Sequence, residues 1–118
     1  MTAWVAVCGL QQLVPERGAA ALVAGEQVAL FRVRVDGRDV VHAVGHRDPF
    51  SGAHVIARGI VGSSGDRDTV ASPMYKQVFD LRTGACLETQ GKDEHALRVW
   101  PVAVDANGDV FIKWKAAA

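Results

Sequence analysis

Turn signals divide this chain into short apolar runs, and this regular spacing limits the folds that the chain can adopt. Asp36-Gly37 and Asn107-Gly108 are dipeptides that favour tight β-hairpins, because the central residues of such turns need positive φ. Turn signals of several kinds recur roughly every eight to twelve residues, and no segment keeps a helical period over three turns. The pattern predicts about eight to ten short strands in an antiparallel β-sandwich or small barrel.

The apolar runs between the turns alternate as half-buried strands do. Expected strands lie at residues 4–8, 27–35, 38–44, 96–104 and 110–114. In the second of these, one face is expected to carry Ala29, Phe31, Val33 and Val35, and the solvent-facing side to carry Arg32 and Arg34. Pro101 lies inside the fourth and indicates an edge position or a bulge, because proline cannot donate to the ladder. Residues 88–94 are polar and predict a loop or at most one helical turn.

Length and charge limit the possible partners. The 118 residues suit one domain spanning residues 1–118. Thirteen basic and thirteen acidic residues give no net charge, and no basic stripe is present, which argues against a nucleic-acid partner. No apolar run is long enough for a membrane span and no targeting segment is visible, so a cytoplasmic location is expected. Cys8 and Cys86 are then expected to be reduced.

Two stretches carry more specific patterns. Residues 46–53 read His-Arg-Asp-Pro-Phe-Ser-Gly-Ala, between two apolar runs. Residues 72–80 read Ser-Pro-Met-Tyr-Lys-Gln-Val-Phe-Asp and lead into Leu-Arg-Thr-Gly. Each stretch holds a proline close to an aromatic residue, so both predict shaped loops rather than plain turns.

These stretches resemble the two cluster-binding loops of the Rieske iron–sulfur family, which read Cys-Pro-His-x-Gly-Ala and Cys-Pro-x-His-x-x-x-Phe-Asp before a Thr-Gly turn. The framework residues shared with that pattern are Pro49, Gly52, Ala53, Pro73, Phe79, Asp80, Thr83 and Gly84. The four ligand positions differ: Asp48 and Ser72 stand for the cysteines, and Phe50 and Tyr75 for the histidines. A chain with this skeleton and these losses resembles the small-subunit family of assimilatory NAD(P)H-dependent nitrite reductase, whose members are Rieske-like without the cluster.

The resemblance spans about residues 28–112 and implies an all-β, Rieske-like antiparallel sandwich or small barrel, with a subdomain that carries both loops at one tip. It also implies a large-subunit partner that holds FAD, sirohaem and an iron–sulfur centre and reduces nitrite to ammonium in nitrate assimilation. This chain is expected to support or assemble that partner, with no cofactor, metal or catalytic residue of its own. A Rieske cluster needs thiolates and imidazoles, and Phe50 offers no donor at all.

Other interpretations of the same residues remain open at this stage. Carboxylate and imidazole groups can bind zinc, and the nearby candidates are His42, His46, Asp48 and His54. An acid–base cluster of His46, Asp48 and Ser51 would need hydrogen-bond reach. A Rieske-type ferredoxin that carries electrons itself, or a clusterless module of another oxidoreductase, would share the framework.

Four residues are expected to contact the partner: Phe50, Met74, Tyr75 and Lys76. Phe50 and Tyr75 could instead fill the space of the cluster, since aromatic rings bury about 150–250 Å² each. Aromatic residues are also frequent binding hot spots, so either ring could serve as an anchor. His95 has no nearby partner in the sequence and is expected to be solvated.

Overall fold

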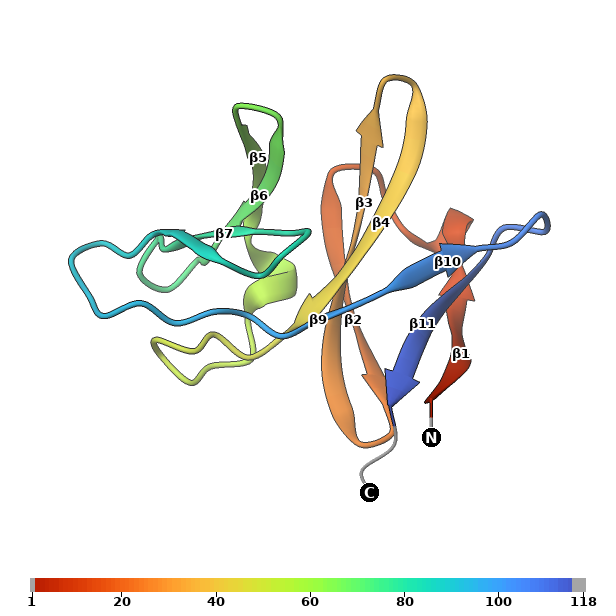
Figure 1. The fold of residues 1–118 in the computed structure, drawn as a ribbon, viewed down its shortest axis with the longest axis horizontal. Helices are drawn as coiled ribbons and strands as arrows, with labels where there is room; N and C mark the ends of the chain where they lie inside the picture. The colour runs from red at the N-terminus through yellow and green to blue at the C-terminus, as the bar shows by residue number, and fades with distance from the viewer. Residues whose placement is uncertain (1, 116–118) are drawn as a thin grey trace.

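The computed structural model describes residues 2–115, which form an all-β fold of eleven strands and two short 3₁₀ turns (Figure 1). The all-β prediction is confirmed. In chain order the elements are β1 (Thr2–Gly9), η1 (Leu10–Gln12), β2 (Arg17–Val23), β3 (Glu26–Val35), β4 (Arg38–Gly45), η2 (Ile56–Arg58), β5 (Ile60–Ser64), β6 (Arg67–Ala71), β7 (Val78–Asp80), β8 (Cys86–Glu88), β9 (Val99–Trp100), β10 (Val102–Val104) and β11 (Asp109–Lys115).

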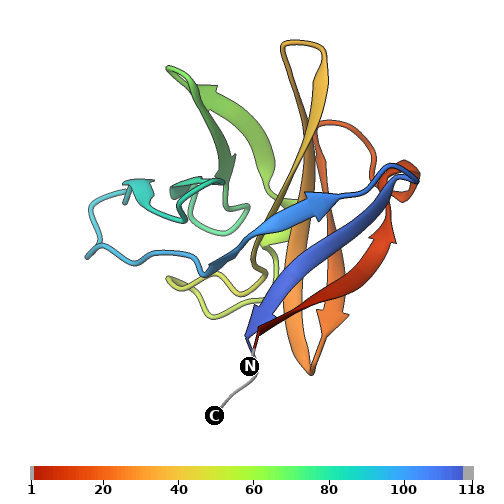
Figure 2. The ribbon, with the colours of Figure 1, turned by 45° about the vertical axis from the view of Figure 1, so that its right-hand side comes forward.

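The strands form three antiparallel sheets, in the orders β1-β11-β10, β2-β3-β4-β9 and β5-β6-β7-β8. The β2–β9 sheet lies between the other two, as Figures 1 and 2 both show. Its neighbour β1-β11-β10 completes a sandwich, and the β5–β8 sheet forms the separate loop-bearing part. This is the predicted architecture of a sandwich with a subdomain at one end.

Both predicted hairpins are present. Asp36 and Gly37 have φ values of 51° and 77° and connect β3 to β4 as a tight turn. Val35 pairs with Arg38 directly across it. The second hairpin joins β10 to β11, and its glycine, Gly108, has a φ of 82°. These local signals are sufficient because both residues of the first turn and the glycine of the second tolerate positive φ.

The prediction that both arginines of β3 face solvent is wrong for Arg32. Its side chain is 18% exposed, and its guanidinium donates to both carboxylate oxygens of Asp39 at 3.0 Å. It also donates to the carbonyl oxygens of Leu10 and Leu13. Because the middle sheet is covered on both faces, the residues that alternate with Phe31 are buried as well. Only Arg34, at the outer end of the strand, is 56% exposed as predicted.

The long strand predicted at 96–104 is broken at Pro101, so that prediction is wrong in length. Trp100 of β9 pairs with Ala43 in the middle sheet, whereas Val102 of β10 pairs with Ile112 of β11. The proline lies where the chain passes from one sheet to the next. Its missing N–H costs no ladder bond there, and its carbonyl oxygen still accepts from Lys113 N at 2.9 Å.

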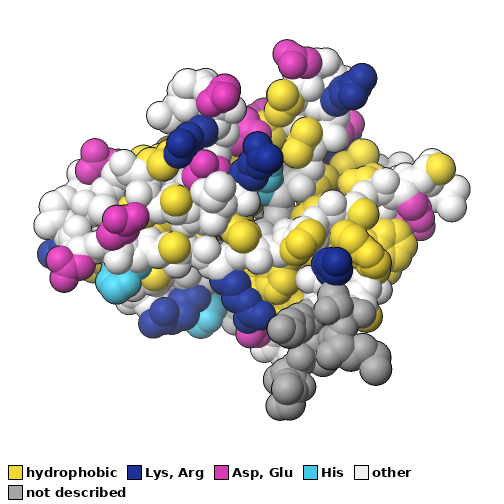
Figure 3. Space-filling model, in the orientation of Figure 1, with side chains coloured by type: hydrophobic (Ala, Val, Ile, Leu, Met, Phe, Trp, Pro, Cys, Tyr) yellow, Lys and Arg dark blue, Asp and Glu magenta, His cyan; other side chains and the backbone are white. Residues whose placement is uncertain are grey.

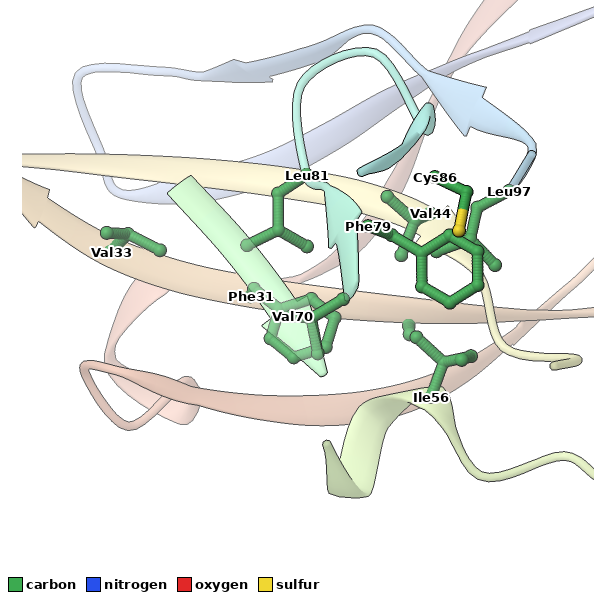
Figure 4. Close-up of a cluster of buried hydrophobic side chains, with 10 residues drawn as sticks. Phe31, Val33, Val44, Ile56, Val70, Phe79, Leu81, Cys86 and Leu97 are labelled. Atoms are coloured by element: carbon green, nitrogen blue, oxygen red, sulfur yellow. The ribbon is translucent and has the colours of Figure 1, made fainter. Parts of the chain in front are cut away.

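Two apolar clusters fill the gaps between the sheets. One joins the middle sheet to β1-β11-β10 and includes Val28 and Leu30 of β3. The other, drawn in Figure 4, joins the opposite face of the middle sheet to the loop-bearing part. Its buried members are Ala29, Phe31, Val33, Val44, Ile56, Val70, Phe79, Leu81, Cys86 and Leu97. This second cluster fixes the β5–β8 sheet, and therefore both loops, against the sandwich.

Candidate functional site: the clusterless tip

The two stretches singled out in the sequence form neighbouring loops, here called the tip. The first loop (residues 46–53) follows β4, and the second (residues 72–77) connects β6 to β7 (Figure 1). An isolated antiparallel bridge between Arg47 and His54 closes the first loop at its base. The structure thus brings together two segments separated by about one fifth of the chain.

The first loop is a tight turn held by Asp48. The backbone N–H of Asp48 donates to Ala53 O at 2.8 Å, and the carbonyl oxygen of Asp48 accepts from Gly52 N at 2.7 Å. The Oδ1 atom accepts from the backbone N–H groups of Phe50 at 2.8 Å and Ser51 at 3.3 Å. Gly52 has a φ of 80°, which glycine adopts without a steric penalty. Asp48 therefore has a complete structural role within its own loop.

A second turn repeats this geometry. After β7, Asp80 N donates to Ala85 O at 2.8 Å and Gly84 N donates to Asp80 O at 2.8 Å. The Oδ1 atom of Asp80 accepts from Arg82 N at 2.8 Å and Thr83 N at 3.3 Å. The sequences Asp-Pro-Phe-Ser-Gly-Ala and Asp-Leu-Arg-Thr-Gly-Ala thus encode one kind of turn. Asp48 occupies the first position of this turn, as Asp80 does in the second one.

The second loop has the same backbone bonds with different side chains. Ser72 N donates to Gln77 O at 2.9 Å, and Lys76 N donates to Ser72 O at 3.1 Å. Ser72 Oγ accepts from Met74 N at 3.3 Å. Lys76 has a φ of 65° at the position where the other two turns have glycine. A left-handed conformation costs an L-residue roughly 1–2 kcal/mol, so this lysine is strained.

A hydrogen bond joins the two loops at their inner ends. Ser72 Oγ donates to Asp48 Oδ2 at 2.5 Å, and neither residue has exposed surface. We call Asp48 and Ser72 the inner pair; the resemblance assigns both to cysteine positions. Each partner satisfies the other, so the loops are held together by protein atoms alone. Buried polar groups are stable only with such partners.

The two residues of the outer pair, Phe50 and Tyr75, differ in burial. Phe50 is half-buried, with its ring 6.0 Å from that of Phe79 and 5.2 Å from that of His95, in an edge-to-face contact. Tyr75 is 55% exposed and Met74 is 43% exposed. Phe50 therefore fills space against the core, whereas Tyr75 does not. His95 is exposed, as predicted, and the fold brings its ring against Phe50 at the tip, a contact that the sequence did not indicate.

The donor set at the tip does not fit a [2Fe–2S] cluster. Such a cluster in a Rieske protein takes thiolates and imidazoles, whereas the inner pair offers oxygens that already bond each other. The two cysteines lie outside the loops, Cys8 on β1 and Cys86 on β8, and neither forms a disulfide. Burial raises the pKa of both thiols, which disfavours the thiolate that binds metal.

The histidines near the first loop have other partners. His42 Nε2 lies 3.2 Å from Asp68 Oδ2, and His46 Nδ1 accepts from Ala57 N at 3.1 Å. Burial, followed by His54 and Arg58, lowers the pKa of His46. An accepting Nδ1 and a lowered pKa both describe a neutral imidazole. His46 thus bonds neither Asp48 nor Ser51, and within residues 2–115 no group of three His, Cys, Asp or Glu is placed to hold a metal.

A pocket of about 750 Å³ opens beside the second loop. Its lining residues are Phe50, Tyr75, Lys76, Gln77, Gln90, Lys92, Asp93 and His95. Charged and histidine side chains lie near one another at this end of the molecule (Figure 3). No sequence pattern marked the residues at 90–95 as part of the tip, because only the fold brings that polar loop there.

Comparison with known proteins agrees with this geometry. A family model described as a Rieske-like [2Fe-2S] domain matches residues 3–113. The chain is 39% identical over 90 residues to the nitrite reductase (NADH) small subunit of Salmonella typhimurium, covering 76% of this chain and 82% of that protein. The chain belongs to this Rieske-like family of nitrite reductase small subunits. The donor atoms at the tip of this chain nevertheless do not fit the [2Fe-2S] cluster that the description of the family names.

Two further relatives extend the comparison. A crystal structure from Mycobacterium tuberculosis, described as that of an NADH-dependent nitrite reductase small subunit, is 42% identical with a TM-score of 0.86, and the match covers 99% of both chains. The nitrite reductase [NAD(P)H] large subunit of Klebsiella oxytoca is 38% identical over 109 residues, which is 92% of this chain and 11% of that protein. A stretch similar to this whole fold is therefore part of a much longer relative. None of the helices in the described part of this chain is long and apolar enough to cross a membrane.

Proposed function

We propose that this chain is the small subunit of a cytoplasmic NAD(P)H-dependent nitrite reductase and acts by docking on the large subunit, without carrying electrons. The observation that carries the proposal is the hydrogen bond between Ser72 and Asp48. It holds the two loops in place through atoms that cannot serve as the thiolate ligands of a cluster. A shaped tip without redox chemistry is suited to contact.

The large subunit as partner is supported by the relatives. In Klebsiella oxytoca, a stretch similar to this chain is contained in a polypeptide named the large subunit. Inclusion in one polypeptide keeps such a domain in contact with the rest of the enzyme. We propose that the partner of this chain supplies FAD, sirohaem and an iron–sulfur centre for the reduction of nitrite to ammonium, as part of nitrate assimilation. This chain supplies no catalytic residue.

The proposed docking surface is the outer end of the tip. Met74 and Tyr75 are exposed there, next to Phe50 and the strained Lys76. Methionine, tyrosine and phenylalanine are enriched in interface cores, and residues on loops of a rigid scaffold commonly make such contacts. Backbone strain at Lys76 is also a feature that clusters at functional sites.

The test is binding between the purified chain and the large subunit from the same source, together with nitrite-dependent oxidation of NAD(P)H. Wild-type chain should bind and should alter either assembly or turnover. Tyr75→Ala should weaken binding about tenfold. Leu22→Ala is the matched control, since Leu22 is an exposed apolar residue on β2.

Two results would contradict the proposal. Absence of binding by wild-type chain would favour a clusterless module of another oxidoreductase. Equal loss of binding in the Leu22 and Tyr75 variants would place the contact elsewhere on the sandwich.

A further inference from the structure

The pocket beside the second loop is larger than a single ion needs. Its volume of about 750 Å³ lies within the range of sites that hold extended organic ligands, roughly 300–1,000 Å³. Phe50 and Tyr75 line it together with residues of the loop at 90–95. Gln90 Nε2 donates to Lys76 O at 3.4 Å and links that loop to the second loop. The volume is sufficient for a short peptide segment.

Gln77 is one of the residues around this pocket, and its side-chain amide is buried without a partner. The residue has no exposed surface, and neither its amide nitrogen nor its amide oxygen has a hydrogen-bond partner. Within residues 2–115, the one other buried side-chain atom in this state is the indole nitrogen of Trp100. A buried amide without partners is unfavourable. Its donors and its acceptor match the C=O and N–H groups of a peptide backbone.

Access to the Gln77 amide requires movement of the pocket walls. The amide is screened from water in the free chain. The exposed side chains of Tyr75 and Lys76 belong to the same pocket, and exposed side chains change rotamer within nanoseconds. A docking segment therefore has to displace side chains of the pocket before it bonds the Gln77 amide.

The charge of the lining favours an acidic ligand. Two exposed lysines, Lys76 and Lys92, face one acidic residue, Asp93. Neither lysine belongs to an ion pair among the described residues. Lys76 also occupies a left-handed position where the two equivalent turns use glycine. A residue kept there despite its strain points to a role for the lysine side chain.

We infer that this pocket receives an extended segment of the large subunit that carries a carboxylate side chain. Lys76 and Lys92 hold the carboxylate, and the Gln77 amide bonds a peptide group of the same segment. The aromatic rings of Phe50 and Tyr75 cover its apolar part. This inference rests on the proposed function and adds the chemistry of the segment that docks.

The first experiment removes the charge. The double variant Lys76→Gln/Lys92→Gln is compared with wild type for binding to the purified large subunit at low and high salt. Affinity should fall about tenfold at low salt, and the salt dependence of binding should largely disappear. Arg38→Gln, at the β3–β4 hairpin, is the matched control and should bind as wild type does. Wild-type affinity and salt dependence in the double variant would overturn the inference.

The second experiment removes the unpaired amide. Gln77→Met keeps the length of the side chain, and the isolated variant should unfold at the same temperature as wild type or higher, because an unpaired polar group is lost. Its affinity for the large subunit should fall about tenfold. A lower unfolding temperature, or unchanged affinity, would overturn the role of Gln77. If wild-type chain fails to bind at all, the proposed function falls with the inference; if it binds and these variants bind equally well, only the inference falls.

Discussion

The inner and outer pairs of the tip each take one residue from each loop, yet they differ in burial and in contacts. Asp48 and Ser72 are fully buried and bond each other. Phe50 is half-buried against the core, and Tyr75 is 55% exposed. The polar atoms of the inner pair thus bond to each other, whereas the exposed ring of Tyr75 has no comparable contact.

This difference shows that the shape of the tip and its surface are specified by separate residues. The shape depends on one turn, used twice with aspartate and once with serine at its first position. The surface depends on side chains that the turn leaves free, such as those of Tyr75 and Lys76. Changes to the inner pair should therefore affect folding, and changes to the outer surface should affect binding.

The largest expected effect follows Asp48→Ala. The substitution leaves the backbone N–H groups of Phe50 and Ser51 and the hydroxyl of Ser72 without their acceptor. Such a loss inside the protein should reduce the free energy of unfolding by about 3–4 kcal/mol. Chemical denaturation of the isolated chain measures it.

Asp80→Ala is the control for that prediction. Asp80 holds the same turn but has no serine partner; its Oδ2 lies 3.6 Å from the half-exposed Arg67. Asp80→Ala should therefore reduce the free energy of unfolding by less, about 2 kcal/mol. Equal losses in the two variants would mean that the bond to Ser72 contributes nothing to the tip.

Phe50→Ala should have the next largest effect. The ring packs against Phe79 and His95 but is only half-buried, so the loss should be about 2 kcal/mol, below the ~3–5 kcal/mol of a fully buried phenylalanine. Tyr75→Ala should change the free energy of unfolding by no more than about 0.5 kcal/mol. Thermal unfolding of both variants distinguishes them. A large shift for Tyr75→Ala would show that both rings fill space.

Acidification should weaken the base of the first loop. The pKa of His46 lies below its ordinary value of 6.5, because of burial and then of His54 and Arg58. The unfolded chain therefore binds this proton more readily than the folded chain. The contribution of His46 to stability is complete above pH 6.5, falls as the pH drops below that value, and levels off below the lowered pKa. Chemical denaturation of wild type and His46→Gln from pH 8 to pH 5 would measure this contribution. An equal pH dependence of the free energy of unfolding in both proteins would contradict the prediction.

A small effect of opposite sign is expected for Lys76→Gly. Removing a lysine with a φ of 65° should raise the free energy of unfolding by about 0.5–1 kcal/mol. The same variant should bind the large subunit more weakly. A variant that is more stable and also binds normally would remove the reason for a lysine at this position.

The sequence predicted the parts of this fold that depend on local chemistry. The Asp36-Gly37 turn and the alternation along β4 need only neighbouring residues, and both are present. The resemblance to the Rieske loops implied that both stretches lie at one tip, and the two loops do lie together. The turn that Asp48 shares with Asp80 is encoded by similar sequences, but only the hydrogen bonds reveal the shared geometry.

The failures came from contacts between distant segments. Arg32 looked solvent-facing because its strand alternates, but a second sheet covers that face. His95 and Gln77 lie in segments that no sequence pattern connects, and only the packing of the loop at 90–95 against the tip brings them together. Pro101 was recognised as irregular, while the switch between sheets depended on the pairing partners of β9 and β10.

The most direct test of the central claim is the iron and acid-labile sulfide content of the chain, purified without oxygen, together with its unfolding temperature with and without a chelator. The account holds that the inner pair, not a cluster, joins the two loops. It predicts no stoichiometric iron or sulfide, no visible absorption band, and an unfolding temperature that the chelator leaves unchanged. Iron and sulfide in the stoichiometry of a [2Fe–2S] cluster, or a chelator-dependent fall in the unfolding temperature, would contradict it.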